Sequence, residues 1–77
     1  MTPSDTGQLK NQIRKLRFEH GEMTQQQLAD RVGVARQTIL ALEAGKYAPS
    51  LPLAFRLATT FNAKIEDVFQ WHPKTED

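Results

Sequence analysis

The 77-residue chain contains no cysteine, which excludes a disulfide scaffold and most structural zinc sites. This absence fits a reducing compartment, and we expect a cytoplasmic protein. No apolar run is long enough to cross a bilayer, and the N-terminal residues MTPSDTGQ have neither the basic nor the hydrophobic part of a signal peptide. We therefore expect no association with membranes.

The sequence also lacks the residue clusters that carry catalysis or bind metals. It has no nucleophile–base constellation, no glycine-rich phosphate loop and no clustered carboxylates, and the chain is too small to enclose a pocket. Its two histidines, His20 and His72, lie far apart and have no acidic or cysteine partner at ligand spacing. We expect neither an enzyme nor a bound cofactor or metal.

The length corresponds to one small domain, near the lower limit at which an apolar core suffices without disulfides or metal. Residues 1–7 are polar and contain Pro3 and Gly7, so we expect a disordered N-terminal tail there. Residues 8–72 form the predicted folded domain. Residues 73–77 form a second, polar tail.

A formal net charge of +1 hides an uneven distribution of charge along the chain. Residues 8–57 hold eight basic and four acidic side chains, whereas residues 58–77 hold two basic and four acidic ones. Such a separation of charge suits a protein whose basic part faces a polyanion and whose acidic part does not. An ordinary solvated surface can have the same balance.

One short segment carries the clearest start and stop signals for a helix. The Thr24 hydroxyl can cap a helix whose third residue, Gln27, can reach back to the backbone N–H of the cap. Leu28 and Val32 then recur at helical spacing, and Gly33 can adopt the positive φ that ends a helix. The sequence predicts a helix over about residues 25–32.

A second helix follows after a short turn, over about residues 36–44. Ile39 and Leu42 would face inward, while the outward side holds Arg36, Gln37, Thr38 and Ala41. Ala29 in the preceding helix is small, as required where two helices cross steeply and their backbones approach. The two helices are typical of a helix-turn-helix unit that reads DNA.

Three further helices and a short ribbon complete the predicted fold. Asn11 caps a first helix that runs to about Glu19, and Ser50 caps a fourth that ends before Asn62. A fifth covers about residues 65–69, and residues 68–71 can pair as a strand with residues 9–10. The expected fold class is all-α: a compact five-helix bundle that a small terminal antiparallel β-ribbon could extend.

Three sequence elements resemble the Cro/C1-type (XRE) family of helix-turn-helix regulators. They are T-Q-x-x-L-A at residues 24–29, R-Q-T-I at residues 36–39 and L-E-x-G-K-Y-x-P-S at residues 42–50. The ending IEDVFQWHP is similar, more narrowly, to the small dimeric cytolysin-repressor type, whose terminal β-ribbon extends the bundle. The resemblance implies a lambda-repressor-like DNA-binding domain and an ion pair between Arg17 and Glu43. Ala35 departs from it, because the family usually has a serine or threonine cap there.

The outward residues of the second helix are the candidates for reading bases. Arginine can pair bidentately with guanine and glutamine with adenine, so we expect Arg36 and Gln37 to enter the major groove. Thr38 could touch a thymine methyl group or a phosphate, and Ala41 a thymine methyl group. The alternative is that these residues are an ordinary solvated helix surface.

Phosphate contacts are expected on either side of that helix. Gln25 lies in a first helical turn, where its amide and the free backbone N–H groups can bind a phosphate. Lys46 and Tyr47 follow the second helix and can reach the DNA backbone, although the Tyr47 ring could instead pack over its own loop. Arg14 and Lys15 are interpreted as a solvated face.

Large apolar residues stand beside the acidic C-terminal segment. We expect Phe69 and Trp71 to build a dimer interface with Leu9 and Ile65, because an exposed aromatic cluster usually marks a contact surface. The alternative is that they close the core of the monomer.

The predicted function is that of a DNA-binding transcriptional regulator, most simply a repressor that binds a palindromic double-stranded operator as a homodimer. A two-fold dimer places its recognition helices about 34 Å apart, which is one turn of B-DNA. Two alternatives remain. The chain could be the antitoxin of a toxin–antitoxin pair, or an interaction module of the same fold that does not read DNA.

Overall fold

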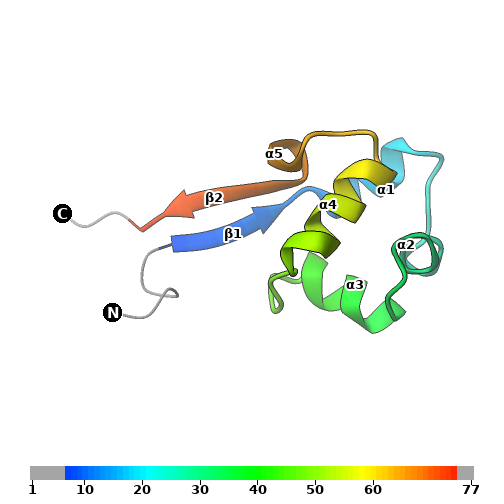
Figure 1. Cartoon of the computed structure of the whole chain (residues 1–77), viewed down its shortest axis with the longest axis horizontal. Coiled ribbons are helices and arrows are strands. Elements are labelled where there is room, and N and C mark those ends of the chain that lie inside the picture. The colour runs from blue at the N-terminus through cyan, green and yellow to red at the C-terminus, as the bar shows by residue number, and fades with distance from the viewer. Residues whose placement is uncertain (1–6, 75–77) are drawn as a thin grey trace.

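The computed structural model describes residues 7–74 as five helices and a two-stranded antiparallel sheet (Figure 1). In chain order the elements are β1 (Gly7–Asn11), α1 (Ile13–Glu19), α2 (Gln25–Val32), α3 (Arg36–Glu43), α4 (Leu51–Thr60), α5 (Ile65–Val68) and β2 (Phe69–Pro73). The predicted fold class, five helices with a terminal ribbon, is confirmed.

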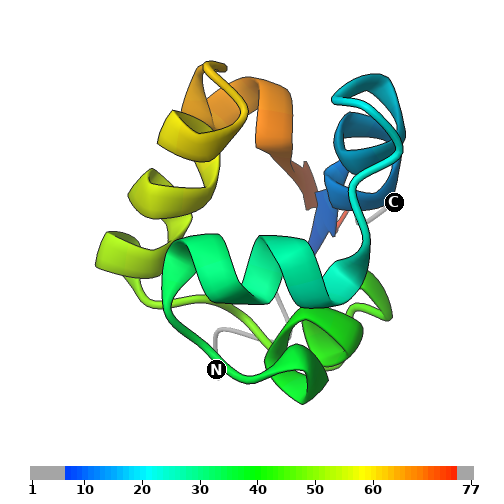
Figure 2. The same cartoon turned by 90° about the vertical axis from the view of Figure 1, so that its right-hand side faces the viewer.

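The helices enclose one apolar core to which every helix contributes. Figure 2 looks along the bundle and shows α2 passing in front, α3 below it and α4 at its side. The side chains that are almost wholly buried are Ile13, Leu28, Ile39, Leu42, Leu57, Phe61 and Val68. Their burial fixes which face of each helix is left for solvent or a partner.

The predicted helix signals are present at α2 and α4. The Gln27 N–H donates to Thr24 Oγ1 at 3.0 Å, and the Thr24 N–H donates to Gln27 Oε1 at 2.8 Å, which completes the capping box. The Leu53 N–H donates to Ser50 Oγ at 3.2 Å. Gly33 ends α2 with a φ of 78°, a conformation that costs glycine nothing.

The predicted cap of the first helix is wrong. Gln12 is the N-cap of α1 and makes no side-chain cap bond. Asn11 lies at the end of β1 instead, where its Oδ1 accepts from the Ile13 N–H at 3.2 Å and its amide donates to the Leu42 carbonyl at 2.8 Å. Asn11 therefore ties the ribbon to the last turn of α3.

The ribbon is longer than the sequence suggested. Leu9 pairs with Trp71, and the ladder continues to a pair between Gly7 and Pro73, which the sequence had assigned to the two tails. That domain boundary is corrected to include both residues in the folded part. The predicted tails over residues 1–6 and 75–77 lie outside the described residues. The paired strands project from the bundle as an arm (Figure 1).

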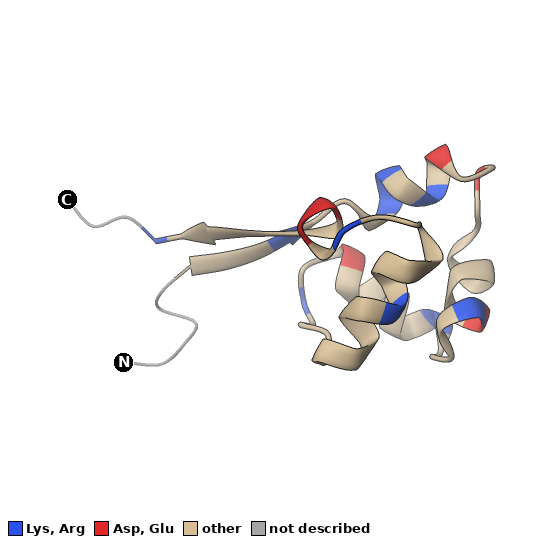
Figure 3. Ribbon diagram, turned by 45° about the horizontal axis from the view of Figure 1, so that its top comes forward, with Lys and Arg blue, Asp and Glu red and all other residues tan. Residues whose placement is uncertain are grey.

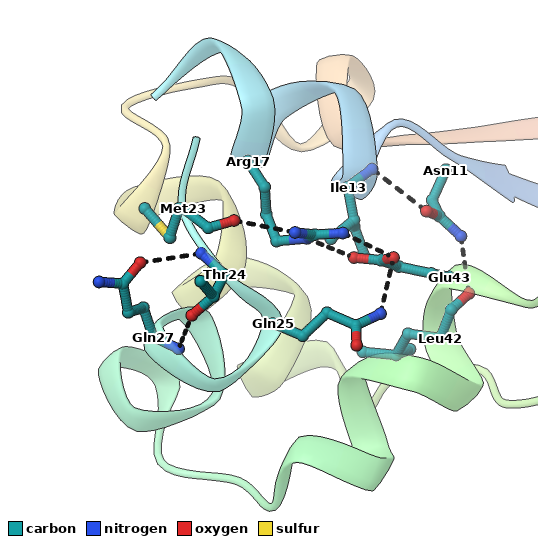
Figure 4. A network of polar contacts seen from close by, with 9 residues as sticks. All are labelled: Asn11, Ile13, Arg17, Met23, Thr24, Gln25, Gln27, Leu42 and Glu43. Atoms are coloured by element: carbon teal, nitrogen blue, oxygen red, sulfur yellow. Dashed lines mark hydrogen bonds and ion pairs between the residues drawn. The ribbon is translucent and has the colours of Figure 1, made fainter. Parts of the chain in front are cut away.

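An ion pair joins α1 to the end of α3 (Figure 4). Arg17 Nε lies 2.7 Å from Glu43 Oε2, and Arg17 Nη2 donates to Glu43 Oε1 at 3.1 Å. Arg17 Nη1 also donates to the Met23 carbonyl at 2.8 Å. Only 14% of the Arg17 side chain and 12% of the Glu43 side chain are exposed, so water compensates poorly for the loss of either partner.

We predict that Glu43→Ala lowers the free energy of unfolding by about 3 kcal/mol, because it leaves a mostly buried guanidinium without its anion. Urea denaturation followed by circular dichroism measures the change. Glu19→Ala is the matched control, since Glu19 is exposed at the end of α1 and has no ion-pair partner among the described residues. Equal losses in the two variants would contradict the structural role of the pair.

Candidate nucleic-acid interface

The outward side of α3 is an open surface on the side of the bundle opposite α5 (Figure 1). Arg36 and Gln37 are exposed in its first turn, and Thr38 and Ala41 are half-buried beside them. Ile39 and Leu42 of the same helix are buried in the core. The structure thus brings the four predicted base-reading residues onto one helix, with a long cation and an amide at the N-terminal end.

The turn between α2 and α3 fixes the angle at which α3 is presented. The N–H groups of Gly33 and Val34 both donate to the Ala29 carbonyl, at 2.8 Å and 3.0 Å, and Ala29 is fully buried where the helices meet. Arg56 Nε, from α4, donates to the Val32 carbonyl at 3.0 Å and satisfies the end of α2. Arg56, counted by sequence among the basic residues, therefore has a structural role.

Ala35 is the N-cap of α3 and makes no side-chain cap bond. The first backbone N–H groups of α3 therefore have no side-chain acceptor at this cap. Free N–H groups at a helix start attract anions such as phosphate. Because alanine stands at this cap in place of the usual serine or threonine, only the backbone N–H groups can attract a phosphate here.

Gln25 is not a free side chain at the start of α2. Its Nε2 donates to Glu43 Oε1 at 3.2 Å, so the carboxylate of Glu43 binds both Arg17 and Gln25 (Figure 4). The sequence did not indicate this contact. A phosphate contact by Gln25 would use its backbone N–H and the part of the amide that Glu43 leaves free.

The loop after α3 holds the other two predicted phosphate contacts. Lys46 is exposed, and its backbone N–H donates to the Ala41 carbonyl at 2.9 Å, which closes the end of α3. Tyr47 is 48% exposed. Both residues follow the C-terminal end of α3, the end that Gln25 of α2 also contacts through Glu43.

Charges are dispersed over the surface and do not form one block (Figure 3). The excess of basic residues in the first half includes Arg17, neutralised by Glu43, and Arg56, bound to a backbone carbonyl. The acidic residues Glu66 and Asp67 lie in α5, away from α3. Glu66 and Asp67 therefore do not offset the exposed basic residues of α3 and of the loop that follows it.

The four predicted interface residues divide into two pairs. Leu9 and Trp71 face each other across the arm and are 36% and 52% exposed. Ile65 and Phe69 are half-buried and pack against the core. Ile65 and Phe69 thus help to close the core of the monomer, as the alternative interpretation expected, whereas Leu9 and Trp71 are left exposed.

Leu40 is a residue of this surface to which the sequence analysis gave no role. It is 42% exposed, although Ile39 and Leu42 beside it are buried. The spacing could have revealed it, since residues three and four positions after Gln37 and Arg36 share their helix face. An exposed leucine on this face requires an explanation of its own.

The two histidines have ordinary surroundings. His20 Nδ1 lies 2.8 Å from the Leu16 carbonyl, and the ring meets that of Phe61 edge-on. His72 is exposed on the arm. Residues 7–74 hold no group of three or more His, Cys, Asp or Glu side chains that could bind a metal ion, and no helix among them is long and apolar enough to span a membrane.

Comparison with known proteins identifies the family. A family model described as helix-turn-helix matches residues 13–68. An uncharacterised HTH-type transcriptional regulator from Archaeoglobus fulgidus is 54% identical over 61 residues, which are 79% of this chain and 86% of the relative. An uncharacterised HTH-type regulator from Bacillus subtilis is 46% identical over 61 residues, 79% of this chain and 91% of the relative.

A solved structure supports the fold. The crystal structure of a candidate DNA-binding protein from Bacteroides fragilis superposes with a TM-score of 0.69, at 22% identity over 80% of this chain and 98% of that one. Residues 13–68, which the family model matches, include the capped α2, the glycine turn and the outward helix α3. The chain belongs to the helix-turn-helix family of transcriptional regulators, which are not enzymes.

Proposed function

We propose that this regulator binds a specific, palindromic DNA operator as a homodimer and represses transcription by occupying promoter DNA. The observation that carries the proposal is the open face of α3, on which Arg36 and Gln37 are exposed while Ile39 and Leu42 anchor the opposite face in the core. A rigidly held helix with exposed hydrogen-bonding groups at its N-terminal end suits the major groove.

Arg36 and Gln37 are proposed to supply the polar readout. The guanidinium of Arg36 would donate to O6 and N7 of guanine, and the amide of Gln37 would pair with N6 and N7 of adenine. Neither side chain has a hydrogen-bond partner within the described residues, so both are available. Thr38 and Ala41, which are half-buried, would make closer contacts with a methyl group or a phosphate.

Contacts to the DNA backbone would orient α3 on the duplex. Gln25 stands at the start of α2, and Lys46 and Tyr47 stand in the loop after α3. Phosphate contacts of this kind fix register on the duplex without reading sequence. They therefore account for affinity, whereas Arg36 and Gln37 account for specificity.

The arm is proposed to join two copies of the chain. Residues paired across an antiparallel ladder lie on the same face, so one face of the arm carries Leu9, Trp71, Phe69 and Pro73, while the other carries Gln8, Lys10, Gln70 and His72. An isolated two-stranded ribbon is marginally stable in water, so its apolar face needs a cover.

A groove beside this apolar face gives the partner a place to dock. Its walls are Gly7, Leu9 and Phe69 of the arm and Leu42, Lys46 and Tyr47 at the end of α3. A second copy bound here by two-fold symmetry would link the arm to the loop that follows the recognition helix. The spacing between the two α3 helices would then be fixed, as in the small dimeric cytolysin-repressor type that the C-terminal sequence resembles.

We predict a steep dependence of DNA affinity on salt, measured on a duplex selected from a random pool. Lys46→Ala should lower the slope of log K against log salt by about 1 per subunit, because one phosphate contact is lost. Arg36→Ala should cost about 1–3 kcal/mol and relax the preference at one base pair.

Lys64→Ala is the matched control for Lys46, because Lys64 is exposed and directly precedes α5, on the side of the bundle opposite α3 (Figure 1). It should leave the salt slope unchanged. Binding that is absent on all DNA, or insensitive to salt, would contradict the proposal and favour a protein-interaction module.

A second prediction concerns the arm. Leu9→Lys should raise the dimer dissociation constant by about 100-fold or more, because two-fold symmetry repeats the change and each lysine places an unpaired charge in an apolar interface. Gln8→Lys, one residue away on the polar face, should leave it unchanged. Sedimentation equilibrium measures both. A wild-type monomer at all concentrations, or equal behaviour of the two variants, would rule out this interface.

A further inference from the structure

The outward face of α3 changes character along its length. Arg36 and Gln37 in the first turn offer hydrogen-bonding groups, whereas the next turn offers only Leu40, Ala41 and Ala44. Leu40 is 42% exposed and Ala44 is exposed, so this second turn is an apolar surface in contact with water. A partner can gain there only by burying apolar atoms.

The surroundings of Leu40 also suit a nucleic acid. Leu40 lines a groove together with Gln25 and Glu43. The Gln25 amide donates to the Glu43 carboxylate at 3.2 Å, so these two polar side chains already have hydrogen-bond partners. Arg14 and Lys15 of α1 lie on the same groove, and both are exposed. The same groove is also lined by Glu22, so its exposed charges are two cations and one anion. A groove that holds an apolar side chain and a net positive charge suits a base edge beside a phosphate strand.

We propose that Leu40 is a specificity-determining residue that reads the C5-methyl group of a thymine. That methyl group is the apolar feature that the four standard bases expose in the major groove. Leu40 follows Arg36 by four residues and Gln37 by three, so it shares their helix face and would meet a base pair next to those they read. This inference rests on the proposed function, because it needs α3 in the major groove.

The test replaces single thymines of a selected operator by deoxyuridine, which removes the methyl group and keeps base pairing. Removing the methyl group at the critical position should weaken binding of the wild-type protein about fourfold in one half-site and about fifteenfold in both, the factors that burial of one and two methyl groups are worth. Titration by fluorescence anisotropy measures each dissociation constant.

The Leu40→Ala variant, measured on both operators, completes a double-mutant cycle between residue 40 and the thymine methyl group. The variant should bind the thymine operator about as weakly as the wild type binds the deoxyuridine operator, and it should not respond to the same substitution. Leu51→Ala is the matched control, since Leu51 is also an exposed leucine, at 67%, but lies in α4. It should keep the full response to the methyl group. Circular dichroism melting checks that both variants remain folded.

The outcomes separate this inference from the proposed function. Sequence-specific binding with no loss at any deoxyuridine position, or methyl responses in Leu40→Ala that equal those of the wild type at every position, would overturn the role of Leu40 and leave the proposed function intact. Failure to select any DNA would overturn both. A methyl response lost only in Leu40→Ala would establish the role.

Discussion

The placement of the recognition helix depends on the carboxylate of Glu43. Its two oxygens accept from Arg17 of α1 and from Gln25 of α2, so one residue in the last turn of α3 ties together three helices. Arg17 also binds the carbonyl of Met23, which holds the loop between α1 and α2. Buried ion pairs add less stability than their geometry suggests, because desolvation offsets much of the attraction. Here the ion pair fixes the orientation of α3, and with it the direction of the side chains on the outward face of α3.

The arm differs from the bundle because it leaves large apolar side chains exposed. The bundle buries apolar side chains in one core, whereas the two strands leave Leu9 and Trp71 uncovered. Gly7 is part of this arrangement, because a Cβ there would lie 2.7 Å from the Trp71 ring and 2.5 Å from the His72 carbonyl oxygen. The Trp71 ring therefore approaches the first strand closely at Gly7. Leu9 and Trp71 remain exposed, and we propose that a second copy covers them.

Local signals in the sequence were sufficient for most of the fold. The Thr24 capping box, the Gly33 turn and the Ser50 cap depend only on neighbouring residues, and each is present. Contacts between distant elements were harder to predict. Asn11 was interpreted as a helix cap, and its amide binds the Leu42 carbonyl; Gln25 was interpreted as a phosphate contact, and its amide binds Glu43. Those partners are 31 and 18 residues away, so only the docking of the helices decides them. The roles of Arg36, Gln37 and Lys46 toward DNA stay predictions.

The central claim is that the outward face of α3 meets the duplex. The most direct measurement is a ¹H–¹⁵N correlation spectrum of the labelled protein titrated with a selected operator. The account predicts that amide shifts change most at residues 36–41, at Gln25, and at Lys46 and Tyr47, while the amides of α4 and α5 change little. Changes concentrated in α4 and α5, with residues 36–41 unaffected, would contradict it.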